Sequence, residues 1–139
     1  MRLLSKDTQL RKFMRYLITA MLVIVAIIHL LPLSGVVSSE RLMLLYGISF
    51  NEPNLEIVMR HRAVLFGLLG VFLIYAAFRP AIQYLAFIAG FISVVSFLLL
   101  AESVGNFNEQ IARVFIADMV ALICLLIGFA AYLYTKRKI

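Results

Sequence analysis

Four long apolar runs, separated by short polar segments, constrain this chain more than any other feature of its sequence. They occupy about residues 14–33, 57–78, 81–101 and 114–134. A helix of about 20 residues reaches about 30 Å, which is the thickness of a bilayer's hydrocarbon core. With 64% hydrophobic residues, a water-soluble core of this size could not bury so much apolar surface. We therefore predict an all-α integral membrane protein, an antiparallel bundle of four transmembrane helices.

The basic residues divide unevenly between the two ends of such a bundle. Nine of the 13 lie in the N-terminal segment, the turn at residues 79–80 and the C-terminal tail, and the other four lie at the opposite end. Segments rich in Lys and Arg stay in the cytoplasm. We therefore predict a multi-pass protein of a bacterial inner (plasma) membrane with both termini cytoplasmic. Residues 1–13 form a cytoplasmic lead-in that can be helical, residues 14–134 the transmembrane domain, and residues 135–139 a basic cytoplasmic tail.

The first outer connection, residues 34–50, contains the amphipathic segment SERLMLLYG. Ser38 or Ser39 can cap a short helix there, and Gly47 can end it. Because its apolar side chains share one side, we predict that this helix lies at the membrane interface. The residues on that side are Leu42, Leu45 and Tyr46.

Three cations, Arg60, His61 and Arg62, stand where the second long helix turns from polar to apolar. The fully apolar part of that helix, residues 63–78, reaches only about 24 Å. The three cations are therefore drawn into or close to the outer boundary of the bilayer. Glu56 precedes Arg60 by four positions, so an ion pair along the helix is the simplest role for Arg60.

Asp118 is the sharpest candidate for a special role. It follows Arg113 by five positions and so lies about 7–8 Å deeper along the fourth span. A carboxylate at that depth is paired, is protonated or lines a wet cavity. We predict Arg62 as its preferred partner and His61 as the second. Two interpretations stay open: a buried ion pair that sets helix register, and an outward-facing cluster that binds a polar or anionic headgroup. The cluster comprises His29, Arg60, His61, Arg62, Glu102, Arg113 and Asp118.

Sequence motifs of catalysis are absent. The chain has no Gly-rich phosphate loop, no HExxH, no CxxC and no nucleophile elbow. Two histidines at no characteristic spacing are weak evidence for a metal site. We predict no catalytic residue, no metal and no cofactor. Because the bases cluster at span ends, we expect a lipid bilayer and no nucleic acid as the partner.

Small residues recur at helical spacing in the second, third and fourth spans, and they let helix backbones approach closely in lipid. Packing inside the bundle is the simpler interpretation. The alternative is a face for a homo-oligomer or for another membrane protein. Members of these small-residue stripes include Ala63, Gly67, Gly70, Gly90, Ser93, Ala121, Cys124 and Gly128.

A resemblance to a known family is carried by three segments, LYGISFNEPNLEIVMRHRAVLFGLLG, RPAIQYLAFIAGFISVVSFLLL and RVFIADMVALICLLIG. They resemble small proteobacterial four-span membrane proteins that carry the label phosphopantetheine adenylyltransferase. The likeness covers most of the chain from His29 onward, and its most specific part is RHRA-x-LFG-x-LG, from Arg60 to Gly70. A looser similarity is to DoxX-like membrane proteins, some of which accompany quinone-linked oxidoreductases. The soluble adenylyltransferase has an α/β fold and an H-x-G-H-type motif, which this chain lacks, so we predict no adenylyltransferase activity.

Three classes of function stay open. The short loops and the missing catalytic motifs favour a non-catalytic membrane protein, either an accessory subunit or a binder of a lipid or small amphiphile. The alternative is a membrane enzyme acting on a lipid or quinone, with His61 or Asp118 as the acid–base group. The second alternative is an oligomeric transporter or channel.

Overall fold

The structure is a computed structural model that describes residues 2–137, with side chains from residue 6 onward. Met1, Lys138 and Ile139, which belong to the predicted lead-in and tail, lie outside the described residues. The described chain is helical throughout its regular elements. In order these are α1 (Arg2–Leu30), a 3-10 helix η1 (Leu31–Val36), α2 (Ser39–Tyr46), α3 (Pro53–Ala77), α4 (Gln83–Val104) and α5 (Glu109–Arg137).

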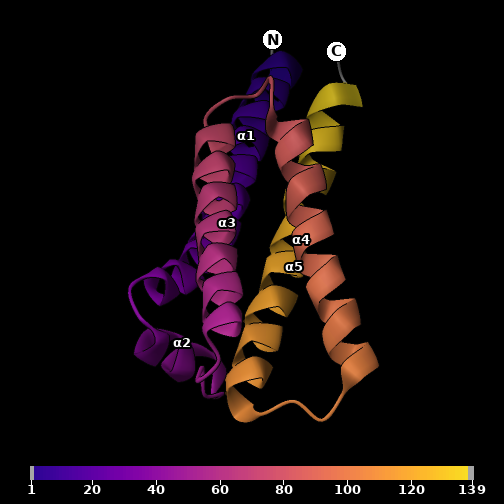
Figure 1. Cartoon of the computed structure of the whole chain (residues 1–139). Helices are drawn as coiled ribbons and strands as arrows, with labels where there is room; N and C mark the ends of the chain where they lie inside the picture. Colours follow the sequence, from indigo (N-terminus) through magenta and orange to yellow (C-terminus); the bar gives the residue numbers. More distant parts are fainter. Residues whose placement is uncertain (1, 138–139) are drawn as a thin grey trace.

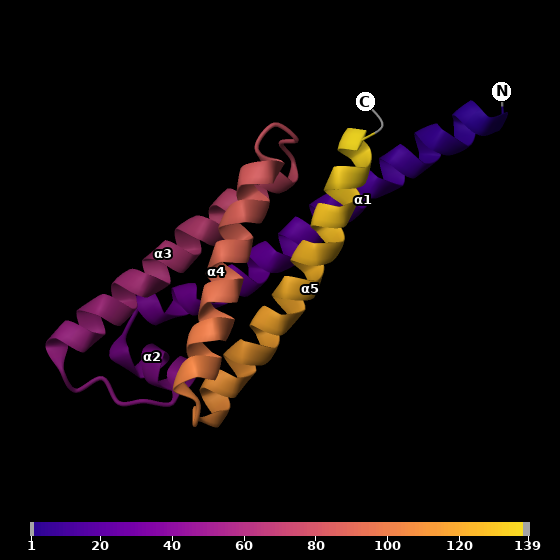
Figure 2. The same cartoon turned by 90° about the vertical axis from the view of Figure 1, so that its right-hand side faces the viewer.

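Four of these helices are long and apolar enough to cross a membrane, and they form a bundle (Figure 1). α1 packs against α3 and α5, and α4 packs against the same two helices from the other side. The start of α1, the α3–α4 turn and the end of α5 lie at one end of the bundle, and α2 and the α4–α5 loop lie at the other. We call the latter the α2 end. The start of α1 projects beyond the other helices (Figure 2).

The short helix α2 has the bounds that its capping residues predict. The Ser38 side chain caps its start by accepting a hydrogen bond from the Arg41 N–H at 3.3 Å. Gly47 ends it in the left-handed region, at φ +66°, and its N–H donates to the Met43 carbonyl. A glycine takes this conformation without the steric cost that a Cβ brings. Of the two predicted cap candidates the structure has Ser38, and the predicted Gly47 end is confirmed.

The long helices extend further than the apolar runs that predicted them. α1 continues back to Arg2, through the lead-in, and α5 starts at Glu109 and reaches Arg137. Hydropathy marks only the apolar part of a helix, whereas the backbone hydrogen bonds continue until a residue ends them. Gly105, at φ +65°, ends α4, and the Asn108 side chain caps α5 by accepting from the Ile111 N–H at 2.9 Å. At the end of α1 the chain tightens into η1, whose first turn contains Pro32.

The small-residue stripes face the inside of the bundle. A Cβ on Gly67 would lie 2.6 Å from a Leu33 methyl group, and one on Gly128 would lie 3.0 Å from the Phe87 ring. α3 and α5 therefore approach their neighbours closely, as helices in lipid do. This packing agrees with the simpler of the two interpretations of the stripes.

A buried polar contact fixes the turn between α3 and α4. The Ala77 carbonyl, at the end of α3, accepts hydrogen bonds from Thr19 Oγ1 at 2.9 Å and from Gln83 Nε2 at 3.2 Å. Carbonyls in the last turn of a helix have no partner within that helix. Side chains from α1 and α4 supply the partners here, which joins three helices at the end opposite α2.

Candidate functional site

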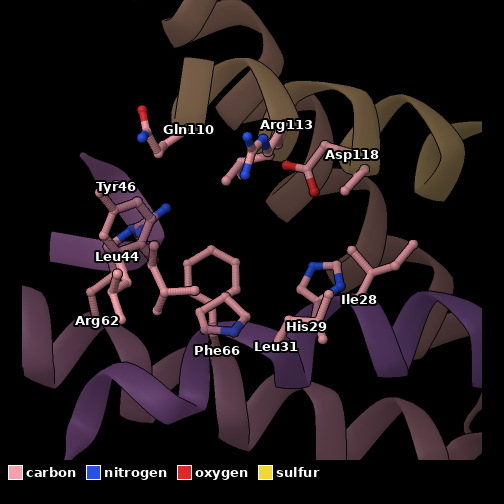
Figure 3. Close-up of a pocket in the computed structure, with 14 residues that line it drawn as sticks. Ile28, His29, Leu31, Leu44, Tyr46, Arg62, Phe66, Gln110, Arg113 and Asp118 are labelled. Carbon is pink, nitrogen blue, oxygen red and sulfur yellow. The ribbon is translucent and has the colours of Figure 1, made fainter. Parts of the chain in front are cut away.

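A partly open cavity of about 240 Å³ lies at the α2 end, lined by residues of α1, η1, α2, α3 and α5 (Figure 3). Its wall combines apolar side chains with a small set of polar ones, which is typical of ligand sites. α3 and α5 do not pack against each other, so the cavity occupies space between diagonal members of the bundle. The polar lining residues are His29, Tyr46, Arg62, Gln110, Arg113 and Asp118.

Helix α2 covers the cavity and is held there from both sides. Leu42, Tyr46 and Phe50 are buried in a small apolar cluster with residues of α3 and α5. Asn108 Nδ2 donates to the Tyr46 carbonyl at 2.8 Å, which ties the end of α2 to the start of α5. A Cβ on residue 47 would lie 2.5 Å from the Gln110 amide oxygen, and the left-handed backbone at φ +66° disfavours any side chain there, so glycine suits this junction. These contacts fix the position of the Tyr46 ring.

Arg62 is the cation that the structure fixes on the cavity wall. Its Nη1 donates to the Tyr46 hydroxyl at 2.7 Å. Its guanidinium carbon lies 4.6 Å from the Phe66 ring centroid and 5.2 Å from that of Tyr46. Rings at such distances stabilise a cation. The other N–H groups of Arg62 donate to no described residue and are available to a ligand or to water.

Asp118, on α5, is 7% exposed, and its carboxylate points into the cavity (Figure 3). Among the described residues none donates a hydrogen bond to it and none forms an ion pair with it. The predicted ion pair with Arg62 is therefore wrong, because the Tyr46 hydroxyl holds the guanidinium. Arg62 acts on the carboxylate only as a nearby charge. The second predicted partner, His61, is exposed and outside the cavity lining.

His29 lines the cavity with a ring whose two nitrogens are both engaged. Nδ1 lies 2.8 Å from the Val25 carbonyl, one turn earlier in α1, and Nε2 lies 3.1 Å from the Ser93 hydroxyl of α4. A carbonyl can only accept, so Nδ1 carries the proton and Nε2 accepts from the serine in the neutral ring. The ring also stacks on Phe66, with centroids 5.7 Å apart. His29 therefore joins α1, α3 and α4 and has no nitrogen left for a metal.

Only part of the predicted cluster of seven residues lies at the cavity. His29, Arg62, Arg113 and Asp118 line the cavity, whereas Arg60, His61 and Glu102 do not. Consecutive residues on a helix point about 100° apart, so Arg60, His61 and Arg62 could not all face the cavity.

Arg60 has the simple role that its spacing predicts, and an additional one. Its Nη1 lies 3.3 Å from Glu56 Oε1, which confirms the predicted ion pair along α3. Its Nε donates to the Val36 carbonyl at 2.9 Å, so Arg60 also holds the end of η1. Glu102 is exposed in the last turn of α4.

Three polar or aromatic lining residues were not predicted as members of the site. Phe66 follows Arg62 by four positions, so the helical spacing could have indicated that the two side chains meet. Tyr46 was predicted only as part of the apolar side of α2, and its hydroxyl turns out to hold Arg62. Gln110 has no signal in the sequence that would have identified it.

The arrangement is suited to binding a small charged group. No group of three residues that could hold a metal ion occurs among residues 2–137. A guanidinium and a carboxylate share one small cavity, and the surrounding wall is largely apolar. Such a site can hold a small charged group and exclude most of the surrounding water. No model of a known protein family matches the chain, and neither a curated protein nor a solved structure matches it.

Proposed function

We propose that this chain is a multi-pass protein of a bacterial inner membrane, an antiparallel four-helix bundle with both termini in the cytoplasm. The four long apolar helices support membrane insertion. The excess of basic residues at the end that carries the termini supports the orientation, because positive loops stay in the cytoplasm. The α2 end and its cavity then face the outside.

Cysteine labelling in intact cells tests this orientation. In a Cys124→Ala background, Ser103→Cys reports on the last turn of α4, next to the α4–α5 loop, and Arg137→Cys reports on the tail. A membrane-impermeant maleimide should label position 103 in intact cells and position 137 only after permeabilisation. The reverse pattern would contradict the proposed orientation.

The function that the site supports best is binding of the anionic headgroup of an amphiphile, without catalysis. The main support is the position of the Arg62 guanidinium, which Tyr46 and Phe66 hold on the wall of a largely apolar cavity of about 240 Å³. A guanidinium binds phosphate and carboxylate groups through paired hydrogen bonds. Arg113, exposed at the edge of the cavity, supplies a second positive charge.

The surroundings of the cavity suit the apolar part of such a ligand. Leu31 and Leu44 line the cavity and are 60% and 73% exposed, so the cavity opens to the outside between apolar side chains. A separate shallow hollow shares Leu31 with the cavity and lies along α1 and η1, lined by Ile27, Leu30, Leu31, Leu33 and Ser34. In a bilayer this surface meets acyl chains.

Lipid binding to the purified protein tests the function. Native mass spectrometry would measure the affinity for phosphatidylglycerol, an anionic lipid, in wild type and in Arg62→Gln. Because a hydrogen bond to a charged group is worth roughly 1.5–3 kcal/mol, Arg62→Gln should lower the affinity by about tenfold or more. Arg60→Gln is the matched control, since Arg60 lies two residues before Arg62 in α3 and does not line the cavity. Equal affinities in all three proteins would overturn the proposal.

The same site is compatible with a role for this chain as an accessory subunit of a membrane complex. A lipid bound in the cavity would then stabilise the subunit. The enzyme alternative has less support, since His61 is exposed outside the cavity and both nitrogens of His29 are engaged. No observation favours a transporter or channel.

A further inference from the structure

The buried carboxylate of Asp118 is the feature that headgroup binding by Arg62 leaves unexplained. It is 7% exposed and points into the cavity, and no described residue donates a hydrogen bond to it (Figure 3). A buried carboxylate without a donor is unfavourable. A ligand that is only anionic would add a like charge to the same cavity. The site is therefore complementary to a ligand that carries a donor as well as an anionic group.

We infer that the ligand headgroup is a zwitterion, a phosphate linked to a primary ammonium, as in phosphoethanolamine. Arg62, supplemented by Arg113, binds the phosphate, and Asp118 accepts N–H donors from the ammonium. This inference rests on the proposed function and adds the second charge of the ligand. The cavity supplies one partner for each end of such a group, because Arg62 comes from α3 and Asp118 from α5.

The size of the cavity agrees with this headgroup. At about 30 Å³ for each water, 240 Å³ holds about eight waters. Phosphoethanolamine has eight non-hydrogen atoms, so it fits within this space. Phosphocholine is larger by three methyl groups and has no N–H to give to Asp118.

The aromatic residues of the cavity also disfavour choline. Quaternary ammonium groups bind on the faces of aromatic rings. In this cavity the Arg62 guanidinium already lies over the rings of Tyr46 and Phe66. The ammonium of the ligand is therefore left with the carboxylate of Asp118, which favours a primary amine.

The ligand's source is the lipid phosphatidylethanolamine rather than free phosphoethanolamine, because an apolar hollow adjoins the cavity at Leu31. An acyl chain in that hollow adds apolar contact that the free headgroup lacks. Both sources share the same headgroup chemistry, and competition separates them.

The test compares phosphatidylethanolamine, phosphatidylglycerol and phosphatidylcholine with identical acyl chains, each bound to the detergent-solubilised full chain. Wild type should bind the ethanolamine lipid about tenfold more tightly than the other two, as a charge-assisted hydrogen bond predicts. Asp118→Asn should lose this preference through weaker ethanolamine binding, and Asp118→Glu, which keeps the charge, should retain it. Circular dichroism of both variants controls for folding.

The outcomes separate the inference from the proposed function. Equal binding of ethanolamine and glycerol lipids in wild type, unchanged in Asp118→Asn, would overturn the zwitterion while Arg62-dependent binding stands. Loss of any dependence on Arg62 would overturn the proposed function itself. Free phosphoethanolamine should displace the lipid only at an excess of about tenfold or more. Displacement at equal concentration would support the zwitterion and overturn the lipid as its source.

Discussion

Replacing Tyr46 with Phe removes one oxygen atom, the acceptor that holds Arg62 on the cavity wall at 2.7 Å. The ring stays, and with it the cation–π contact at 5.2 Å, so the variant isolates the hydroxyl. Hydrogen bonds to charged groups contribute roughly 1.5–3 kcal/mol to stability. Arg62 is half-buried, and cavity water can replace the lost acceptor. We therefore expect Tyr46→Phe to lower the free energy of unfolding by about 1.5 kcal/mol, the lower end of that range.

The assay is equilibrium unfolding of the purified protein in mixed micelles, with a double-mutant cycle. Tyr46→Phe is combined with Arg62→Leu, and in a second cycle Arg62→Leu is combined with Asp118→Asn. The Tyr46–Arg62 coupling should be about 1.5 kcal/mol, since the two groups are in direct contact. The Arg62–Asp118 coupling should stay below about 1 kcal/mol, because separated charges across a wet cavity attract weakly.

Tyr16→Phe is the matched control, because Tyr16 is 75% exposed and its ring is far from the cavity. Its effect on stability should be small. Equal effects of Tyr46→Phe and Tyr16→Phe would refute the assigned role of the hydroxyl. The reverse order of the two coupling energies would refute the geometry and restore the ion pair that the sequence predicts.

Two further predictions concern the helices that build the site. Gly70→Ala should destabilise the protein by about 1 kcal/mol, because the gain in helix propensity is outweighed by overpacking. The new Cβ would lie 2.7 Å from Leu30 Cγ and 3.1 Å from a backbone oxygen of α1. Gly90→Ala should instead be neutral or stabilising, since the nearest neighbour of the new Cβ is the end of the Leu125 side chain, a methyl group at 2.9 Å. The measurement compares the unfolding midpoints of the two variants. A lower midpoint for Gly90→Ala than for Gly70→Ala would contradict this account of the packing. Glu52 caps α3, and hydrogen bonds from the Asn54 and Leu55 N–H groups hold its pKa below the ordinary value of 4.5. Because the pKa of Glu52 is lower in the folded protein, its carboxylate stabilises the fold fully above pH 4.5. This stabilisation is lost as the pH falls through the pKa of the folded protein. The stability difference between wild type and Glu52→Gln should therefore shrink on acidification, and a constant difference would contradict the role of the carboxylate.

The sequence predicts the helices of this protein well because the signals for helices are local. Apolar runs long enough to cross a bilayer predict α1, α3, α4 and α5. The Ser38 cap and the Gly47 end of α2 each depend on neighbours within four residues, and both are confirmed. The Glu56–Arg60 ion pair is predictable for the same reason. The lengths of the helices are less predictable, since hydropathy does not detect their polar ends.

The partners within the cavity depend on contacts between residues far apart in the chain. The depth of each residue along its helix suggests Arg62 as the partner of Asp118. Both residues do line the cavity. Depth cannot show that α2 folds back over α3 and brings the Tyr46 hydroxyl to the guanidinium, across 16 positions in sequence. Nor can it show that Ser93, 64 positions away, satisfies His29. The sequence by itself determined which charges lie near one end of the bundle. Only the tertiary structure decided which of them are paired and that Asp118 is left facing a cavity, because the packing of α2, α3 and α5 sets which acceptors lie within reach of each donor.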